Sequence, residues 1–328
     1  MTRFLPYEAT FLADLSAIYE KLHPATVGCF NLSTVSFIPI ATFVRGGSHL
    51  WFVEQRAGRI EGLLSEDIAR EQSGRSACLA CDATLSGDDF CAAYVARTTK
   101  TGPSCGHLSA VPGDPARCAQ FVPGRKLRVI HGDGGRGRGA GFATRVEAVV
   151  AGASTPTNAV EAAIDACQRS ATMNIPLPIE DGALDLMISV LAPSRLMEHP
   201  YAYFEELMTR RFGAWTTHAR EKLVRKLDAL RGALFQTQLD AHVRELARLA
   251  HPRRGRLYFA TMSTEVGPNG SWTLERGITA CFEALASHFV FDFDTFPAEA
   301  FLRRVSDDRS VVLQASLLRP KPRDGGAP

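Results

Sequence analysis

Hydrophobic residues recur along most of the chain at the spacings of helices and strands. Apolar positions three and four residues apart predict helices over residues 9–22, 59–71, 142–152, 156–168, 200–211, 217–250 and 275–287. Short apolar runs predict strands at residues 25–33, 50–54, 127–131, 184–191, 256–264, 289–293 and 311–318. Helices alternate with strands until the last pair, so the pattern predicts a mainly parallel sheet covered by helices on both faces.

Local signals refine some of these boundaries. Ser154, Thr155 and Pro156 provide a cap and a first-turn proline for the helix that follows them. Pro200 is interpreted in the same way, as the first residue of the helix over 200–211. Gly232 is the expected break within the long apolar pattern of residues 217–250.

One stretch, residues 74–124, interrupts the periodic pattern. It is rich in Gly, Pro, Ser, Thr and Asp, and it contains five of the eight cysteines, spaced C-x2-C-x9-C-x13-C-x12-C. The CxxC pair lets two sulfurs face one ion, and more distant cysteines can complete a tetrahedral or cluster site. The candidate ligands are Cys78, Cys81, Cys91, Cys105 and Cys118, with His107 as a possible substitute for one of them. Zinc and an iron–sulfur cluster both remain open, as does a loop with incidental thiols.

Composition narrows the class of protein. Of the 328 residues, 45% are hydrophobic and 22% charged, as expected for a globular enzyme-sized chain. A formal net charge of +2 argues against a strongly basic nucleic-acid binder. No apolar run approaches the roughly 20 residues of a membrane helix. Glu8 and Asp14 lie where a secretory signal would be apolar, so we expect a cytoplasmic protein with reduced thiols.

The predicted organisation is one large α/β domain with an insertion. Its ranges are 1–73 for the N-terminal helix and the first part of the domain, 74–124 for the cysteine-rich insertion, 125–320 for the remainder and 321–328 for a flexible tail.

A glycine-rich segment, Gly132–Gly141, follows the strand at 127–131 and matches G-x-G-x-x-G at Gly132, Gly134 and Gly137. Its backbone N–H groups, with Arg136 and Arg138, can cradle a phosphate, and the competing interpretation is a flexible surface loop.

Three segments of the C-terminal half resemble a known family. PIEDGALDLMISV, HPYAYFEELMTRRFG and the pair HFVFDFD and SVVLQASLLRP are similar to the fourth strand, the following helix and the closing hairpin of class I S-adenosylmethionine-dependent methyltransferases. The resemblance implies a Rossmann-like, seven-stranded, mainly parallel sheet with a C-terminal antiparallel hairpin. The cysteine-rich insertion is not a general feature of that family.

Two placements of the family's first strand are possible. In the first, ATVGCFNLS is strand one, LWFVE is strand two and LRVIH is strand three, although NLSTVSF has no glycine where the family has its turn. In the second, LRVIH is strand one and GDGGRG is the turn, but only about eight residues then precede VEAVV, whereas a parallel crossover needs a dozen or more. The first placement is preferred for this reason.

The resemblance also implies a site and a function. It places S-adenosylmethionine against Asn31, Glu54, Gly132, Asp133 and Ser189. Glu54 would bind the ribose hydroxyls, Asp133 would lie near the adenine and Ser189 near the methyl-acceptor pocket. No residue is identified as a catalytic base, and methyl transfer depends mainly on alignment of the reacting atoms.

The expected function is that of a methyltransferase-like enzyme carrying a cysteine-ligated iron–sulfur cluster or zinc ion. Its acceptor would be a small molecule or a macromolecule, with nucleic acid a minority interpretation and no membrane partner. One alternative is a non-catalytic methyltransferase-like protein that senses metal or redox state or serves in assembly. Another is a nucleotide-binding oxidoreductase that uses the glycines from Gly132 to Gly137.

Overall fold

The computed structural model describes most of the N-terminal segment and nearly all of the C-terminal half. The described residues are 6–30, 37–54, 94–95, 104–105, 127–132, 134–213, 217–267, 270–273, 275–297, 299–306 and 309–322. The helices within them are α1 (Pro6–Leu22), α2 (Ile40–Arg45), α5 (Arg138–Gly152), α6 (Pro156–Ser170), α7 (Ala192–Phe212), α8 (Thr217–Leu249) and α9 (Glu275–Ala286). The strands are β1 (Thr26–Phe30), β2 (His49–Glu54), β3 (Tyr94–Val95), β4 (Ser104–Cys105), β5 (Leu127–His131), β6 (Leu186–Val190), β7 (Arg256–Gly267), β8 (Gly270–Thr273), β9 (Phe289–Phe291), β10 (Glu299–Ser306) and β11 (Arg309–Pro320).

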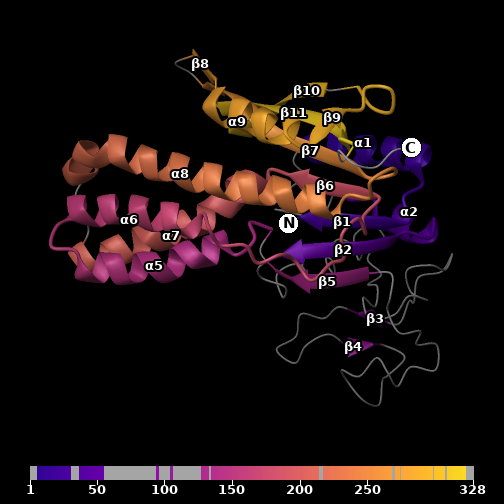
Figure 1. Ribbon diagram of the computed structural model, residues 1–328. Coiled ribbons are helices and arrows are strands. Elements are labelled where there is room, and N and C mark those ends of the chain that lie inside the picture. Colours follow the sequence, from indigo (N-terminus) through magenta and orange to yellow (C-terminus); the bar gives the residue numbers. More distant parts are fainter. Residues whose placement is uncertain are drawn as a thin grey trace.

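The main sheet is mixed, and its larger part is parallel. Its strands lie in the order β10-β11-β7-β6-β1-β2-β5 (Figure 1). In addition, β8 pairs with β7, and β9 pairs with β11. The five strands β5, β2, β1, β6 and β7 run parallel, whereas β11 is antiparallel to both β7 and β10. The predicted α/β class is confirmed. The sheet has nine strands among the described residues rather than seven, because β8 and β9 extend it.

The position of β1 decides between the two placements of the first strand. β1 lies in the middle of the parallel strands, between β2 and β6, and β5 pairs only with β2 at the edge of the sheet. The alternative in which Leu127–His131 is the central first strand is therefore wrong. The chain leaves β1 toward β2 and β5, then returns across it to β6 and β7. The order thus reverses beside β1, where open α/β sheets bind ligands at the carboxyl ends of the strands.

The closing hairpin differs from the sequence prediction in its first strand. The expected antiparallel pairing of residues 289–293 with β11 is present at Phe289–Phe291, but the main hairpin partner of β11 is β10, from Glu299 to Ser306. Residues Phe289–Phe291 form β9 and pair with the other end of β11, at Leu318 to Pro320. The chain turns between them at Asp292, whose carboxylate accepts hydrogen bonds from the backbone N–H and hydroxyl of Thr295.

Three helix boundaries were also predicted incorrectly. Pro200 lies inside α7, which begins at Ala192, and Pro193 occupies the early position that suits proline. α8 is continuous through Gly232, at which an added Cβ would meet no atom within 4 Å. α5 begins at Arg138, so the last part of the supposed glycine loop is helical. Thr155 caps α6 as predicted, and its hydroxyl accepts a hydrogen bond from the Asn158 N–H at 3.2 Å.

Three apolar cores hold these elements together. One lies between α1, α2 and one face of the sheet and includes Phe11, Phe37 and Phe52. The second lies between the opposite face and the helices α8 and α9. The third joins α5, α6, α7 and the first half of α8 in a helical bundle beside the sheet (Figure 1). The arrowheads of β2 and β5 point toward the side where this bundle lies, so α8 connects the sheet and the bundle at the carboxyl ends of the strands.

Candidate functional site at the carboxyl edge of the sheet

Three of the residues predicted to bind the cofactor lie at the carboxyl ends of the parallel strands. Glu54 is the last residue of β2 and stands in register with His131, the last residue of β5. Gly132 follows β5 directly, and Ser189 is the next-to-last residue of β6. The topology thus brings these three positions to one edge of the sheet. Asn31 and Asp133 lie outside the described residues.

Ser189 is buried and takes part in a hydrogen-bonded chain across the second core. Its hydroxyl lies 2.9 Å from Nε2 of His242 on α8, and Nδ1 of His242 lies 3.3 Å from the carbonyl oxygen of Gly134. A carbonyl can only accept, so these partners assign the hydrogen to Nδ1 and leave Nε2 to accept from Ser189. The imidazole also meets the edge of the Phe30 ring. The chain therefore ties β6, α8 and the segment after β5 together.

Burial keeps His242 uncharged. Its side chain is fully inaccessible, and removal from water lowers its pKa from 6.5 to about 4, against the opposing effects of the Gly134 carbonyl and Glu245. A neutral imidazole holds one donor and one acceptor, which are the two functions that Gly134 and Ser189 require. His242 thus supports the edge of the sheet in its neutral form.

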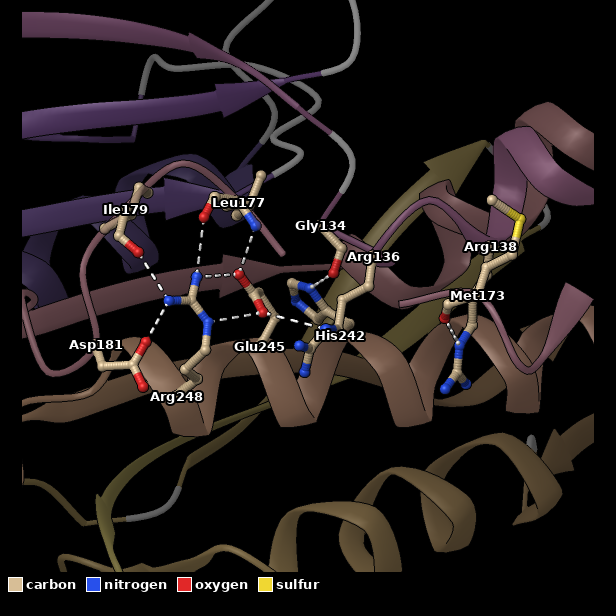
Figure 2. Close-up of polar contacts among 10 residues, drawn as sticks. All are labelled: Gly134, Arg136, Arg138, Met173, Leu177, Ile179, Asp181, His242, Glu245 and Arg248. Carbon is tan, nitrogen blue, oxygen red and sulfur yellow. Dashed lines mark hydrogen bonds and ion pairs between the residues drawn. The ribbon is translucent and has the colours of Figure 1, made fainter. Parts of the chain in front are cut away.

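Glu245, one turn further along α8, is a buried carboxylate with several partners. It accepts a hydrogen bond from the backbone N–H of Leu177 at 2.8 Å and binds the guanidinium of Arg248 (Figure 2). Nε of Arg136 lies 3.4 Å from its second oxygen, which suits an ion pair but lacks hydrogen-bond geometry. Arg248 in turn donates to Asp181 at 2.6 Å and to the carbonyl of Ile179 at 2.7 Å. The charges hold residues 177–181 and Arg136 against α8.

The glycines after β5 allow close approach of another part of the chain. A Cβ at Gly132 would lie 2.4 Å from Cδ2 of Leu177, and one at Gly137 would lie 2.8 Å from Cδ1 of Ile175. The Ile175 N–H also donates to the carbonyl of Arg136 at 2.9 Å. Residues 175–177 therefore account for close contacts at Gly132 and Gly137 without a phosphate, and the positive φ of Gly137, 79°, itself favours glycine. Arg138 is likewise engaged, with the carbonyls of Met173 and Thr237.

Backbone strain is concentrated in the turns at this edge. Among the described residues, three non-glycine residues have positive φ: His23, Arg136 at 56° and Leu191 at 57°. Arg136 lies in the turn after β5, and Leu191 follows β6 directly. Such conformations are unfavourable for residues with a side chain and gather at functional sites. Two of the three therefore mark the ends of the strands beside the point where the strand order reverses.

One of the five candidate metal ligands, Cys105, lies within the described residues. Cys105 is in β4, in register with Tyr94 of β3, whereas Cys78, Cys81, Cys91 and Cys118 lie outside the described residues. In the part of the chain that the structure describes, no group of three or more His, Cys, Asp or Glu side chains is arranged to hold a metal. Cys29, Cys167 and Cys281 are buried free thiols, and burial raises the pKa of each. These three are therefore protonated at neutral pH.

Sequence reasoning did not single out the polar residues of α8. Gln238, His242 and Glu245 are all fully buried, and their spacings of four and three residues place them on one face of the helix. That spacing was the available signal, because polar residues repeated at helical period inside an apolar pattern indicate a polar face. The basic residues Arg210, Lys226 and Arg231 instead form exposed ion pairs with Glu206, Glu161 and Asp228.

No described helix is long and apolar enough to cross a membrane. Comparison with protein-family models found no match to this chain, and comparison with curated proteins found none either.

Proposed function

We propose that this chain is an S-adenosylmethionine-dependent methyltransferase-like enzyme that binds its cofactor at the carboxyl edge of the sheet. The supporting observation is the strand order. β1 is central, β2 and β5 extend the sheet to one side, β6 and β7 extend it to the other, and an antiparallel pair closes it beside β7. The resemblance to class I methyltransferases implies a mainly parallel sheet closed by an antiparallel hairpin, and this strand order supports it. The reversal beside β1 supports a ligand site at the ends of β1 and β6.

When bound, the cofactor supplies a sulfonium methyl group, which an acceptor lone pair takes while the carbon–sulfur bond breaks and sulfur keeps its electron pair. In this proposal Glu54 binds the two ribose hydroxyls from the end of β2. Ser189 holds the end of β6 to α8, since its hydroxyl is bound by His242. Asn31 and Asp133 keep their proposed places beside the cofactor. A site formed in this way acts by aligning the reactants and excluding water.

The proposal includes a metal bound by the cysteine-rich segment. Thiolates are the donors that zinc and iron–sulfur clusters prefer. Cys78, Cys81, Cys91, Cys105 and Cys118 are its candidate ligands, whereas the three remaining cysteines are buried in the described cores. The metal would stabilise this segment and help it to recognise the methyl acceptor.

The cofactor site is tested by titrating S-adenosylhomocysteine into wild-type protein and into Glu54→Ala. We expect the substitution to weaken binding by tenfold or more, about 1.4 kcal/mol, because the ribose hydroxyls lose their acceptor. Glu206→Ala is the matched control, since Glu206 is an exposed glutamate of α7 paired with Arg210. Equal affinities for wild type and Glu54→Ala would refute the placement of Glu54.

The metal site is tested by measuring zinc, iron and sulfide in anaerobically purified protein. The double variant Cys78→Ser with Cys81→Ser is expected to lose the metal. Cys167→Ser is the control, because the Cys167 thiol lies in the helical bundle beside the hydroxyl of Thr237. Unchanged metal content in the double variant would refute metal binding by this pair.

One observation favours a non-catalytic binding or assembly protein instead. Gly132 and Gly137 lie against the side chains of Leu177 and Ile175, so the chain itself accounts for close contacts that the phosphate interpretation assigned to a cofactor. This alternative predicts a folded, metal-loaded protein that binds neither S-adenosylmethionine nor S-adenosylhomocysteine. The oxidoreductase alternative loses support, since β5 lies at the edge of the sheet and not at the reversal of strand order.

A further inference from the structure

Gln238 is a polar side chain that is buried within the molecule. It is fully inaccessible to water, and neither its amide oxygen nor its amide nitrogen has a hydrogen-bond partner among the described residues. Burying an amide without partners is unfavourable, and nearly all buried polar groups in proteins are hydrogen-bonded. Gln238 therefore requires an explanation that packing does not provide.

The face of α8 that carries Gln238 meets the segment after β5. His242 and Glu245, four and seven residues further on, share this face, and they contact Gly134 and Arg136 respectively. The backbone carbonyl of the neighbouring Thr237 accepts a hydrogen bond from Arg138 at 2.9 Å. Figure 2 shows this segment lying along α8. The face of α8 that carries Gln238 thus includes the contacts of α8 with residues 134–138.

Gln238 also lies at the carboxyl side of the sheet. Ala250 bridges to Leu184, just before the start of β6, and His242 bonds to Ser189 near the end of β6. α8 therefore runs against the direction of β6, and Gln238 lies one turn beyond His242. The two strained turns at this edge, marked by Arg136 and Leu191, follow β5 and β6. Strain and an unpaired amide are independent signs of function, and both lie on the carboxyl side of the sheet.

The group left unpaired on this face of α8 is a neutral amide. Arg138 donates to two backbone carbonyls, and Arg136 faces Glu245. A primary amide presents one acceptor and one donor in a plane, and this pattern pairs with the edge of adenine that carries the exocyclic amine and a ring nitrogen.

We propose that Gln238 is a specificity-determining contact for the purine base of the nucleoside cofactor, with its amide oxygen accepting from the exocyclic amine and its amide N–H donating to a ring nitrogen. The inference rests on the proposed function for the identity of the nucleoside. It assigns to α8 a recognition role that is separate from the ribose contact at Glu54.

The test compares Gln238→Met with wild type, using S-adenosylhomocysteine and its counterpart that carries unsubstituted purine. Wild type is expected to prefer adenine by about tenfold or more, and Gln238→Met is expected to lose that preference while binding the purine compound as wild type does. Gln236→Met is the matched control, since Gln236 is an exposed glutamine of α8 bonded to Asp240. Gln236→Met should keep the full preference.

A second measurement separates recognition from support of the fold. Without ligand, Gln238→Met should unfold at the same temperature as wild type or higher, because an unpaired buried amide has been removed. A lower temperature would show that internal water satisfies the amide and would overturn the proposal, as would an adenine preference that survives the substitution. Wild-type binding that does not depend on Gln238 would overturn this inference alone. Binding of adenosine, but not of S-adenosylhomocysteine, that depends on Gln238 would refute only the proposed function. No binding of either nucleoside would overturn both.

Discussion

The two edges of the parallel sheet satisfy their polar groups differently. At the amino edge, the Asp185 carboxylate accepts from the backbone N–H groups of Ala25 and Thr26 and pairs with Arg254. Arg256 and Asp292 form a close ion pair nearby. At the carboxyl edge, two turns are strained, and Gln238 is buried with no hydrogen-bond partner among the described residues. The amino edge has one non-glycine residue of positive φ, His23, among the residues that the structure describes. Unfavourable features that gather at one edge of a sheet indicate that this edge serves a purpose other than stability.

The largest effect should come from the buried charges that support the carboxyl edge. Glu245→Ala leaves Arg136, Arg248 and the Leu177 N–H without their carboxylate, and breaking a buried pair in this way costs about 3–5 kcal/mol of unfolding free energy. Urea denaturation followed by circular dichroism measures the loss. Glu206→Ala, at an exposed pair, should change the free energy little. A similarly small loss for Glu245→Ala would contradict the supporting role of this network.

The next effect depends on pH. The folded-state pKa of His242, about 4, lies below its unfolded value of 6.5, so the unfolded chain binds the proton more readily between these values. The contribution of neutral His242 to the free energy of unfolding is therefore fully present above pH 6.5. It falls by about 3 kcal/mol as the pH drops toward 4. Urea denaturation of wild type and of His242→Gln at several pH values between 4 and 6.5 measures this loss of unfolding free energy. The same slope in both proteins would show that other groups cause the dependence.

A substitution at the amino edge should lower stability by a smaller amount and leave cofactor binding unchanged. Asp185→Ala removes the acceptor of two backbone N–H groups at the amino edge and should lower the unfolding free energy by about 2 kcal/mol. Its affinity for S-adenosylhomocysteine, measured by calorimetry on the folded variant, should equal that of wild type. A loss of affinity comparable with that of Glu54→Ala would remove the functional distinction between the edges.

The smallest effect on stability is expected at Gln238. Gln238→Met should leave the unfolding free energy unchanged or raise it slightly, in contrast to Asp185→Ala. Differential scanning calorimetry of both variants without ligand tests the opposite signs. A clear loss of unfolding free energy in Gln238→Met would show that the amide of Gln238 is hydrogen-bonded as fully as the polar groups of the amino edge.

Much of the fold could be predicted from local patterns. The five parallel strands form short apolar runs, and the preferred placement put β1, β2 and β5 in their observed order. β10 was missed because its Arg303 and Arg304 interrupt the apolar pattern, and its pairing with β11 is a tertiary choice. Pro200 was misassigned because the helix continues through a residue that usually starts or breaks one.

The site was less accessible to sequence reasoning. Glu54, Gly132 and Ser189 were placed at strand ends by pattern, and the topology brings them to one edge. Gln238, His242 and Glu245 were missed because isolated polar residues on a long helix are usually exposed, and only packing reveals their burial. Whether Gly132 and Gly137 serve a ligand or a neighbouring segment likewise depends on Ile175 and Leu177, which the chain brings back from a distance.

Hydrogen–deuterium exchange with and without saturating S-adenosylhomocysteine tests the central claim most directly. We predict slowed exchange in residues 132–138 and 190–192 at the carboxyl edge. Residues 182–186 and 253–256 at the amino edge should exchange at the same rate in both conditions. Protection confined to the amino edge, or none at all in folded, metal-loaded protein, would contradict a cofactor site at the carboxyl edge.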